Sequence, residues 1–92
     1  MITAIVFVKA EVPKIPQVAQ QIADMDGISE VYSVSGSIDL IAVVRVKTLD
    51  DVAEVISDRL SKVPGVLGTE THVAFQTYSK VDLESAFSLG EG

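Results

Sequence analysis

The sequence predicts one α+β domain in which a four-stranded antiparallel sheet carries two helices. Two segments, Ile2–Lys9 and Leu40–Lys47, place apolar side chains on both faces of a strand, which is typical of the middle of a sheet. Two further segments repeat apolar residues at helical spacing and end at Gly27 and at Pro64-Gly65. The chain of 92 residues is long enough for one such domain.

An internal repeat indicates the order of these elements. With an offset of 38 residues, Gly27-Ile28 coincides with Gly65-Val66, and the apolar positions of the first strand and helix coincide with those of the second half. Each half reads strand, helix, glycine stop, strand, and two such halves give βαββαβ, the ferredoxin-like arrangement. The expected sheet order is 4-1-3-2, which puts the two segments that are apolar on both faces in the centre.

The first helix is predicted to begin between Pro13 and Pro16, because proline is tolerated only in the first turn of a helix. It runs to about Asp26 and buries a stripe formed by Ile15, Val18, Ala19, Ile22 and Met25. Ile28–Val34 follows as a more polar strand, which is typical of a sheet edge that faces solvent.

The second helix is predicted to start at Thr48, because Thr48 and Asp51 have the spacing of a capping box. Asp50, Asp51 and Glu54 could hold a hard cation, but acids in the first turn usually serve as capping residues. The buried stripe of this helix is expected at Leu49, Val52, Val55, Ile56, Leu60 and Val63.

The fourth strand is predicted within Val66–Tyr78, so that the ferredoxin-fold domain occupies residues 1–78. Residues 79–92 are expected to form a C-terminal tail with a short helix that starts at the Ser79-x-x-Asp82 box. The apolar face over Leu83–Phe87 is expected to pack on a neighbouring copy.

One face of the predicted sheet has no helix to cover it. Ile5, Phe7, Ile41 and Val43 lie on that face, where they would form an exposed apolar patch of a kind that small soluble proteins avoid. Hydrophobic residues make up 48% of the chain, which is more than a small monomer can bury. We therefore expect a homodimer with the two sheets face to face, of the dimeric α+β barrel type.

Composition and charge exclude several classes of function. The chain has no cysteine, so thiolate metal sites and cysteine nucleophiles are excluded, and no cofactor is expected. A formal charge of −6 without a basic patch argues against direct DNA binding. Neither a signal peptide nor a membrane-length apolar run is visible, so a cytoplasmic protein without membrane contact is expected.

Enzymatic chemistry has few candidate residues in this sequence. His72 is the only histidine, and a lone histidine lacks the nucleophile and orienting group of a catalytic triad. No glycine-rich phosphate loop follows a strand. The sequence therefore favours a protein that is not an enzyme.

A candidate ligand site consists of a glycine turn and two threonines. Gly36 leaves backbone N–H groups accessible to a carboxylate, Asp39 could pair with an ammonium, and Thr69 and Thr71 could supply paired hydroxyls. Together these groups could hold a zwitterion such as a free amino acid. The structural alternatives are a plain turn glycine, an acid at a strand start and β-branched residues of an edge strand.

Three motifs in order resemble the effector domain of the Lrp/AsnC transcriptional regulators. Val34–Val44 resembles its Gly-x-x-Asp turn and strand, Gly65–Thr71 is similar to its Gly-Val-x-x-Thr-x-Thr segment, and Asp26–Val31 resembles its Gly-Val-x-x-Val helix end. The likeness runs from Ile2 to about Thr77. Those regulators also carry an N-terminal helix-turn-helix, for which this chain has no room, so we expect a stand-alone RAM domain (regulation of amino acid metabolism).

The resemblance implies a non-catalytic, oligomeric module that senses effectors. It implies dimers that assemble into rings, and amino acids or related metabolites bound between subunits. By position, the ligand-binding residues would be Gly36, Ser37 and Asp39 in the turn, with Thr69 and Thr71 from the fourth strand. Ser37 stands where the family often has an aromatic residue. The resemblance also implies an association with full-length Lrp/AsnC regulators.

Two alternatives share the topology. Small dimeric α+β barrel enzymes, such as oxygenases or isomerases, use a pocket between sheet and helices, which His72 would have to line. ACT-like modules bind amino acids through sheets placed side by side, whereas central strands that are apolar on both faces favour face-to-face pairing.

Overall fold

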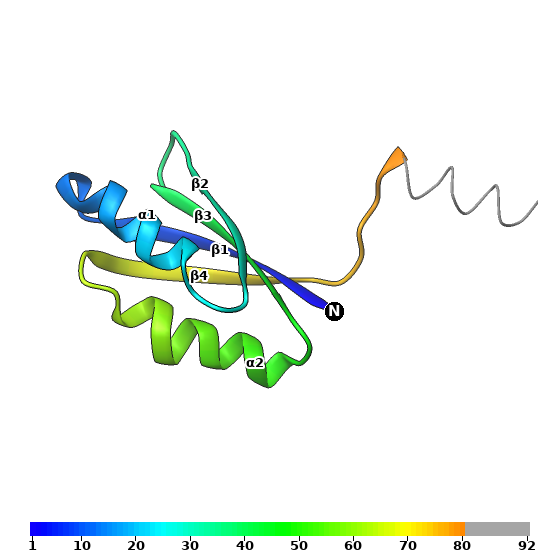
Figure 1. Ribbon diagram of the computed structural model, residues 1–92. Coiled ribbons are helices and arrows are strands. Elements are labelled where there is room, and N and C mark those ends of the chain that lie inside the picture. The colour runs from blue at the N-terminus through cyan, green and yellow to red at the C-terminus, as the bar shows by residue number, and fades with distance from the viewer. Residues whose placement is uncertain (81–92) are drawn as a thin grey trace, which may run out of the picture.

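Strands β1 (Ile2–Ala10) and β3 (Leu40–Val46) form the middle of a four-stranded sheet in the computed structural model, which describes residues 1–80. β2 (Ile28–Ser33) and β4 (Val66–Ala74) are the edge strands, and the order is β2-β3-β1-β4 with every pair antiparallel (Figure 1). Read from the other edge this is 4-1-3-2, so the predicted topology is confirmed.

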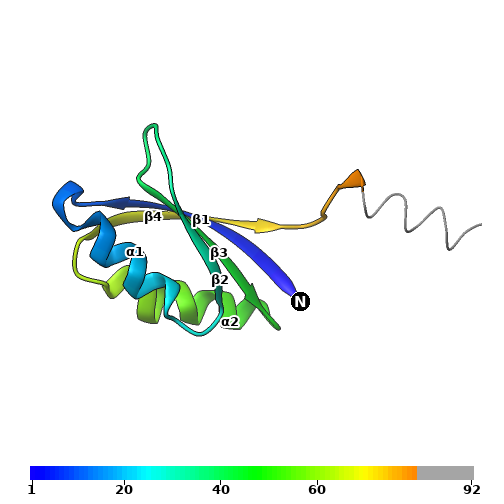
Figure 2. The same ribbon diagram turned by 45° about the horizontal axis from the view of Figure 1, so that its top comes forward.

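Both helical segments lie on the same face of the sheet (Figure 2). The even-numbered side chains of β1 and β3 point toward them, and Ala4, Val6, Val8, Leu40, Ala42 and Val44 are all fully buried. Val18 and Ile22 from the first helix and Val55 and Leu60 from the second pack on this layer. No helix within residues 1–80 combines the length and the apolar character needed to cross a bilayer.

Helix α1 (Ile15–Ala23) follows a short 3₁₀ turn, η1 (Val12–Lys14), and has Pro16 in its first turn, as expected. It ends before the predicted Asp26. The chain leaves the helix through Asp24 and Met25 and reaches Gly27, whose φ of 92° redirects it into β2. Pro13 lies in η1 and Pro16 lies in the first turn of α1.

Helix α2 (Leu49–Ala53) is capped as predicted, since Thr48 and Asp51 form both hydrogen bonds of the capping box. It does not continue as an α-helix. It passes into a π-helix, η2 (Glu54–Arg59), and then a 3₁₀ turn, η3 (Leu60–Lys62). The prediction for Leu49 was wrong: its side chain is 58% exposed, because it occupies the first position after the cap, one turn before the buried Val52.

β4 ends at Ala74, earlier than the predicted limit at Tyr78. Its partner strand explains the difference, since Ala74 pairs with Thr3 and β1 begins at Ile2. Beyond Ala74 the chain runs away from the sheet, and Phe75 and Tyr78 are 96% and 83% exposed. The predicted capping box and short helix of the tail lie mostly outside the described residues.

Candidate functional site

The predicted ligand turn connects β2 to β3 at one end of the sheet. Gly36 has a φ of 116°, and a Cβ added there would have no neighbour within 4 Å, so its backbone is open to an approaching group. Ser37 is also exposed. The turn therefore presents free backbone rather than packed side chains.

Asp39 is the most constrained residue of this turn, with a side chain only 14% exposed. Its Oδ2 accepts a hydrogen bond of 2.9 Å from the backbone N–H of Ala10, and its own N–H donates to the carbonyl of Val8 at 3.0 Å. Asp39 thus fastens the turn to the end of β1. The contacts support the structural interpretation of this acid, and they use Oδ2 and not Oδ1.

Lys9 joins the site and was not singled out from the sequence. Its ammonium lies 3.7 Å from Asp39 Oδ2 and donates to the carbonyl of Ser37 at 3.2 Å. The side chain is half exposed, so this ion pair contributes little to stability. With Lys9 the turn contains an ammonium, a carboxylate and open backbone amides, which are complementary to the two charges of a free amino acid.

Thr69 and Thr71 lie on β4, across β1 from the turn. Thr69 pairs with Val8, which pairs in turn with Leu40 on β3, so Thr69 is two strand spacings, about 10 Å, from the end of the turn. Thr71 pairs with Val6 and is one strand repeat farther away. Both threonines are partly buried on the face that carries the helices. The structure therefore brings Ser37, Asp39 and Lys9 together but not the threonines.

The opposite face of the sheet carries the four residues predicted at a dimer interface. Ile5 pairs with Val43 and Phe7 pairs with Ile41, so their side chains form one apolar patch over the two central strands. Neither helix covers it (Figure 2). We call this the open face; polar residues border it on β2 (Glu30 and Tyr32) and on β4 (Glu70 and His72).

His72 lies on this open face and not between sheet and helices. Its ring is 5.1 Å from the ring of Phe7, centroid to centroid, and its Nε2 contacts the carboxylate of Glu70. On the other border, Tyr32 donates a hydrogen bond of 2.6 Å to Glu30, and this bond raises the pKa of the Tyr32 phenol above 10. The pocket that the enzyme alternative requires is therefore not lined by His72.

Comparison with known proteins identifies relatives of this fold and sequence. The family model described as the Lrp/AsnC ligand binding domain matches residues 3–82. An uncharacterised HTH-type transcriptional regulator of Pyrococcus abyssi is 39% identical over 61 residues, which cover 66% of this chain and 41% of the relative. The regulator YugG of Bacillus subtilis is 37% identical over 62 residues, or 67% of this chain and 37% of YugG. The chain thus spans about two fifths of these relatives.

Several solved structures share this fold. TTHA0845 from Thermus thermophilus is 35% identical, with a TM-score of 0.82, and the match covers 87% of this chain and all of that one. E. coli AsnC shares the fold at 15% identity, with a TM-score of 0.79 over 85% of this chain and 53% of AsnC. A Neisseria meningitidis regulator, solved as a complex with L-Met, shares it at 11% identity, with a TM-score of 0.77 over 85% and 52%.

Proposed function

The chain belongs to the Lrp/AsnC ligand-binding domain family, and from this premise we propose that it is a non-catalytic module that senses amino acids or related metabolites as an oligomer. The observation that carries the proposal is the turn at Gly36–Asp39, where Lys9 and Asp39 place opposite charges beside open backbone. The amino acid carboxylate would bind Lys9 and the turn amides, and its ammonium would bind the free oxygen of Asp39. Binding of L-Met by the Neisseria regulator is consistent with this ligand class.

The effector site would be completed by a neighbouring copy of the chain. Thr69 and Thr71 are about 10 Å or more from the turn of their own chain, measured across the strands, so a small amino acid bound at Asp39 does not reach them. The threonines of a second copy can approach the turn more closely. The uncovered apolar patch at Ile5, Phe7, Ile41 and Val43 gives the chain a reason to assemble.

Assembly would start from a dimer with open faces in contact and extend to a ring. In this arrangement the module acts on transcription by associating with full-length regulators of its family, whose ligand-binding domains share its fold. A side-by-side, ACT-like assembly is less favoured, because it would leave the open face exposed.

The test is light scattering and thermal unfolding, with and without each of the twenty amino acids at millimolar concentration. One amino acid should change the assembly mass or the melting temperature. Asp39→Asn should abolish that response while it keeps an acceptor for the Ala10 N–H. Glu11→Gln, which removes a nearby exposed acid that forms an ion pair with Lys14, should not. If none of the twenty amino acids changes the assembly mass or the melting temperature, the sensing proposal is overturned.

A further inference from the structure

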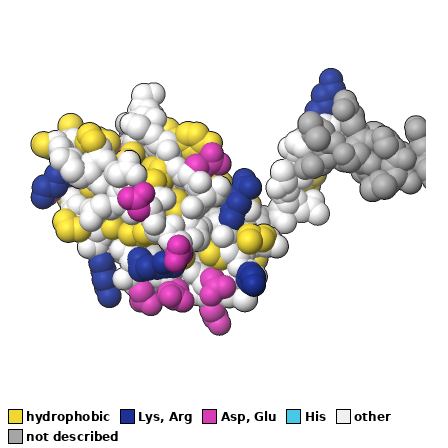
Figure 3. Space-filling model, in the orientation of Figure 1, with side chains coloured by type: hydrophobic (Ala, Val, Ile, Leu, Met, Phe, Trp, Pro, Cys, Tyr) yellow, Lys and Arg dark blue, Asp and Glu magenta, His cyan; other side chains and the backbone are white. Residues whose placement is uncertain are grey.

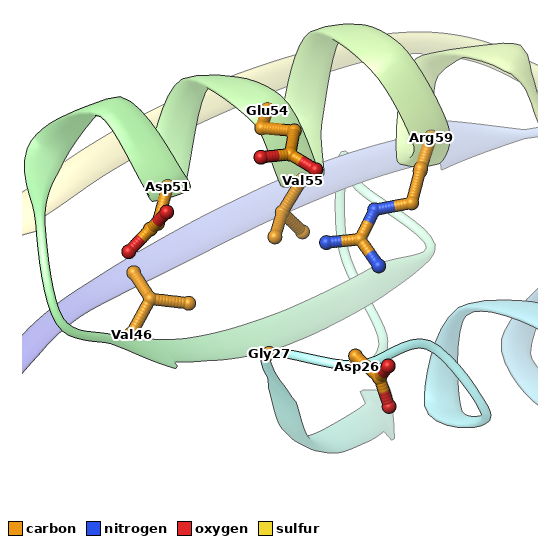
Figure 4. Close-up of a pocket in the computed structure, with 7 residues that line it drawn as sticks. All are labelled: Asp26, Gly27, Val46, Asp51, Glu54, Val55 and Arg59. Atoms are coloured by element: carbon orange, nitrogen blue, oxygen red, sulfur yellow. The ribbon is translucent and has the colours of Figure 1, made fainter.

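A cavity of about 290 Å³ lies on the helix side of the sheet, between the helical segment after Thr48 and the loop that leads into β2 (Figure 4). It is lined by Asp26, Gly27, Val46, Asp51, Glu54, Val55 and Arg59. Gly27 precedes β2 and Val46 ends β3, so the cavity is at the opposite end of this hairpin from the Gly36–Asp39 turn. Its volume is at the lower end of the range for small-molecule pockets.

Arg59 enters this cavity without a partner. Its Nε is fully buried and has no hydrogen bond, and no carboxylate of residues 1–80 lies within ion-pair distance of its guanidinium. Figure 4 shows the terminal nitrogens directed into the space under the helix. A guanidinium whose Nε is shielded from water and unpaired gains from an anion that binds its planar fork, and a carboxylate has the matching geometry.

Three carboxylates line the same cavity at other positions. Asp26 and Glu54 are exposed at its mouth, and Asp51 is partly buried and uses Oδ2 to cap Thr48. Acidic side chains also gather over this helical segment in the space-filling view (Figure 3). Three carboxylates against one guanidinium leave the cavity with a formal charge of −2. A ligand with two cationic groups and one carboxylate can pair with two of these carboxylates and with Arg59.

The π-helix accounts for this grouping. Glu54 and Arg59 are its first and last residues, and in an α-helix five residues make about 1.4 turns, which would direct the two side chains apart. The i→i+5 bonding of a π-helix has a wider turn and brings positions five apart closer to one side. Acids at the helix start and bases at its end are otherwise common dipole partners, but that interpretation leaves the buried, unpaired Nε unexplained.

We propose that this cavity is a second binding site, for a basic α-amino acid such as lysine or ornithine. The ligand carboxylate binds Arg59 in the interior, its hydrocarbon chain contacts Val46 and Val55, and its two ammonium groups bind the carboxylates, with Asp26 and Glu54 at the mouth. The site lies within one protomer and on the side of the sheet away from the open face. It does not depend on the effector site proposed at Asp39.

The test is calorimetric titration of the full chain with lysine and with cadaverine, which is lysine without its carboxylate. Lysine should bind with a dissociation constant below about 1 mM, and cadaverine should bind roughly tenfold or more weakly, because it lacks the charge-assisted bonds to Arg59. Arg59→Gln should weaken lysine by a similar factor and should not weaken cadaverine, because it removes a positive charge that repels this dication. Lys62→Gln, which removes an exposed cation that does not line the cavity, is the matched control.

Glu54→Gln tests the mouth of the cavity without changing Arg59, and Asp58→Asn is its control. Glu54→Gln should weaken both ligands, and Asp58→Asn neither. Asp39→Asn should leave lysine binding intact, so failure of the effector site and failure of this one are distinguishable. No heat of binding at about 10 mM lysine, or equal affinity of the wild type and Arg59→Gln, would overturn the proposal.

Discussion

The two faces of the sheet use the same strands in opposite ways. On the covered face, the side chains of Val6, Val8 and Leu40 are fully buried under the helices of the same chain. On the open face, Ile5, Phe7 and Ile41 are only partly buried, and charged or polar residues of the edge strands border them. The apolar centre and polar rim of the open face are typical of a protein interface.

The difference shows that one chain covers only one of the two apolar faces of its sheet. Alternation in β1 and β3 supplies two apolar surfaces, but both helices of residues 1–80 cover the same one. The first surface is a folding core, and the second is better explained as an assembly surface. Substitutions on the covered face should therefore mainly lower the free energy of unfolding, and substitutions on the open face should mainly weaken association.

The largest effect on folding is expected at Leu40, in the covered face. Leu40→Ala should lower the free energy of unfolding by about 2–5 kcal/mol, because the side chain is fully buried and leaves a cavity. Ile41→Ala, one residue along the same strand, should cost less than half of this, since its side chain points to the open face. Urea titrations of both variants, at a protein concentration low enough to leave single chains, measure the contrast. A larger loss at Ile41 would reverse the assignment of the faces.

The next effect is expected on assembly. Ile41→Lys should weaken association by more than about 2 kcal/mol, because a charge would be desolvated at the centre of the interface. The mass from light scattering should fall to that of a single chain, while the circular dichroism spectrum is retained. Val12→Lys, at a 72% exposed valine outside both faces, should leave the mass unchanged. An Ile41→Lys variant that keeps the wild-type mass would contradict face-to-face pairing.

A smaller effect on stability is expected from alanine substitutions of two glycines, one on the packed side of the fold and one in the open turn. Gly65→Ala and Gly36→Ala both place a side chain at a positive φ, of 102° and 116°, which costs roughly 1–2 kcal/mol each. Only at Gly65 would the new Cβ meet a packed neighbour, Val18 Cγ2 at 2.8 Å. Gly65→Ala should therefore lose about 1–3 kcal/mol more in thermal unfolding than Gly36→Ala. Equal losses of stability would indicate that α1 moves away from the new methyl group at little cost.

The smallest effect concerns the border of the open face. The hydrogen bond to Glu30 raises the pKa of Tyr32, which favours the neutral phenol in the folded protein. This contribution is present below pH 10 and is lost as the pH rises through the folded-state pKa. Glu30→Gln should lower the pKa of Tyr32, as measured by phenolate absorbance in a Tyr78→Phe background. An unchanged titration would show that the bond is absent in solution.

The fold follows from local patterns that are visible in the sequence. Two-sided apolar alternation places β1 and β3 in the centre, and the Thr48–Asp51 spacing locates the start of α2, because both signals depend on near neighbours. The end of β4 could not be predicted, because pairing stops where β1 stops and not where the apolar alternation of β4 stops. The change to a π-helix after Ala53 has no sequence signal that we recognise.

The candidate site is less predictable, because it depends on contacts between distant residues. The bond from Ala10 to Asp39 joins positions 29 apart, and Lys9 enters the site through the same register of β1 against the turn. A lysine at the end of an apolar strand is a weak sequence signal for a binding site, and its role is visible only once the strand pairing is known. Arg59 likewise had a sufficient explanation in helix electrostatics until its lack of a partner was visible.

The sheet order has a consequence for synthesis of the chain. Its two similar halves interleave, since β1 pairs with β3 and β4 but not with β2. A nascent chain can pair β1 with β3 early, yet one edge of β1 stays bare until Ala74 has been made, and a bare central strand is a template for aggregation. Neither half of the repeat is therefore an independent folding unit, and a ribosome that stalls before β4 would release a chain prone to associate through β1.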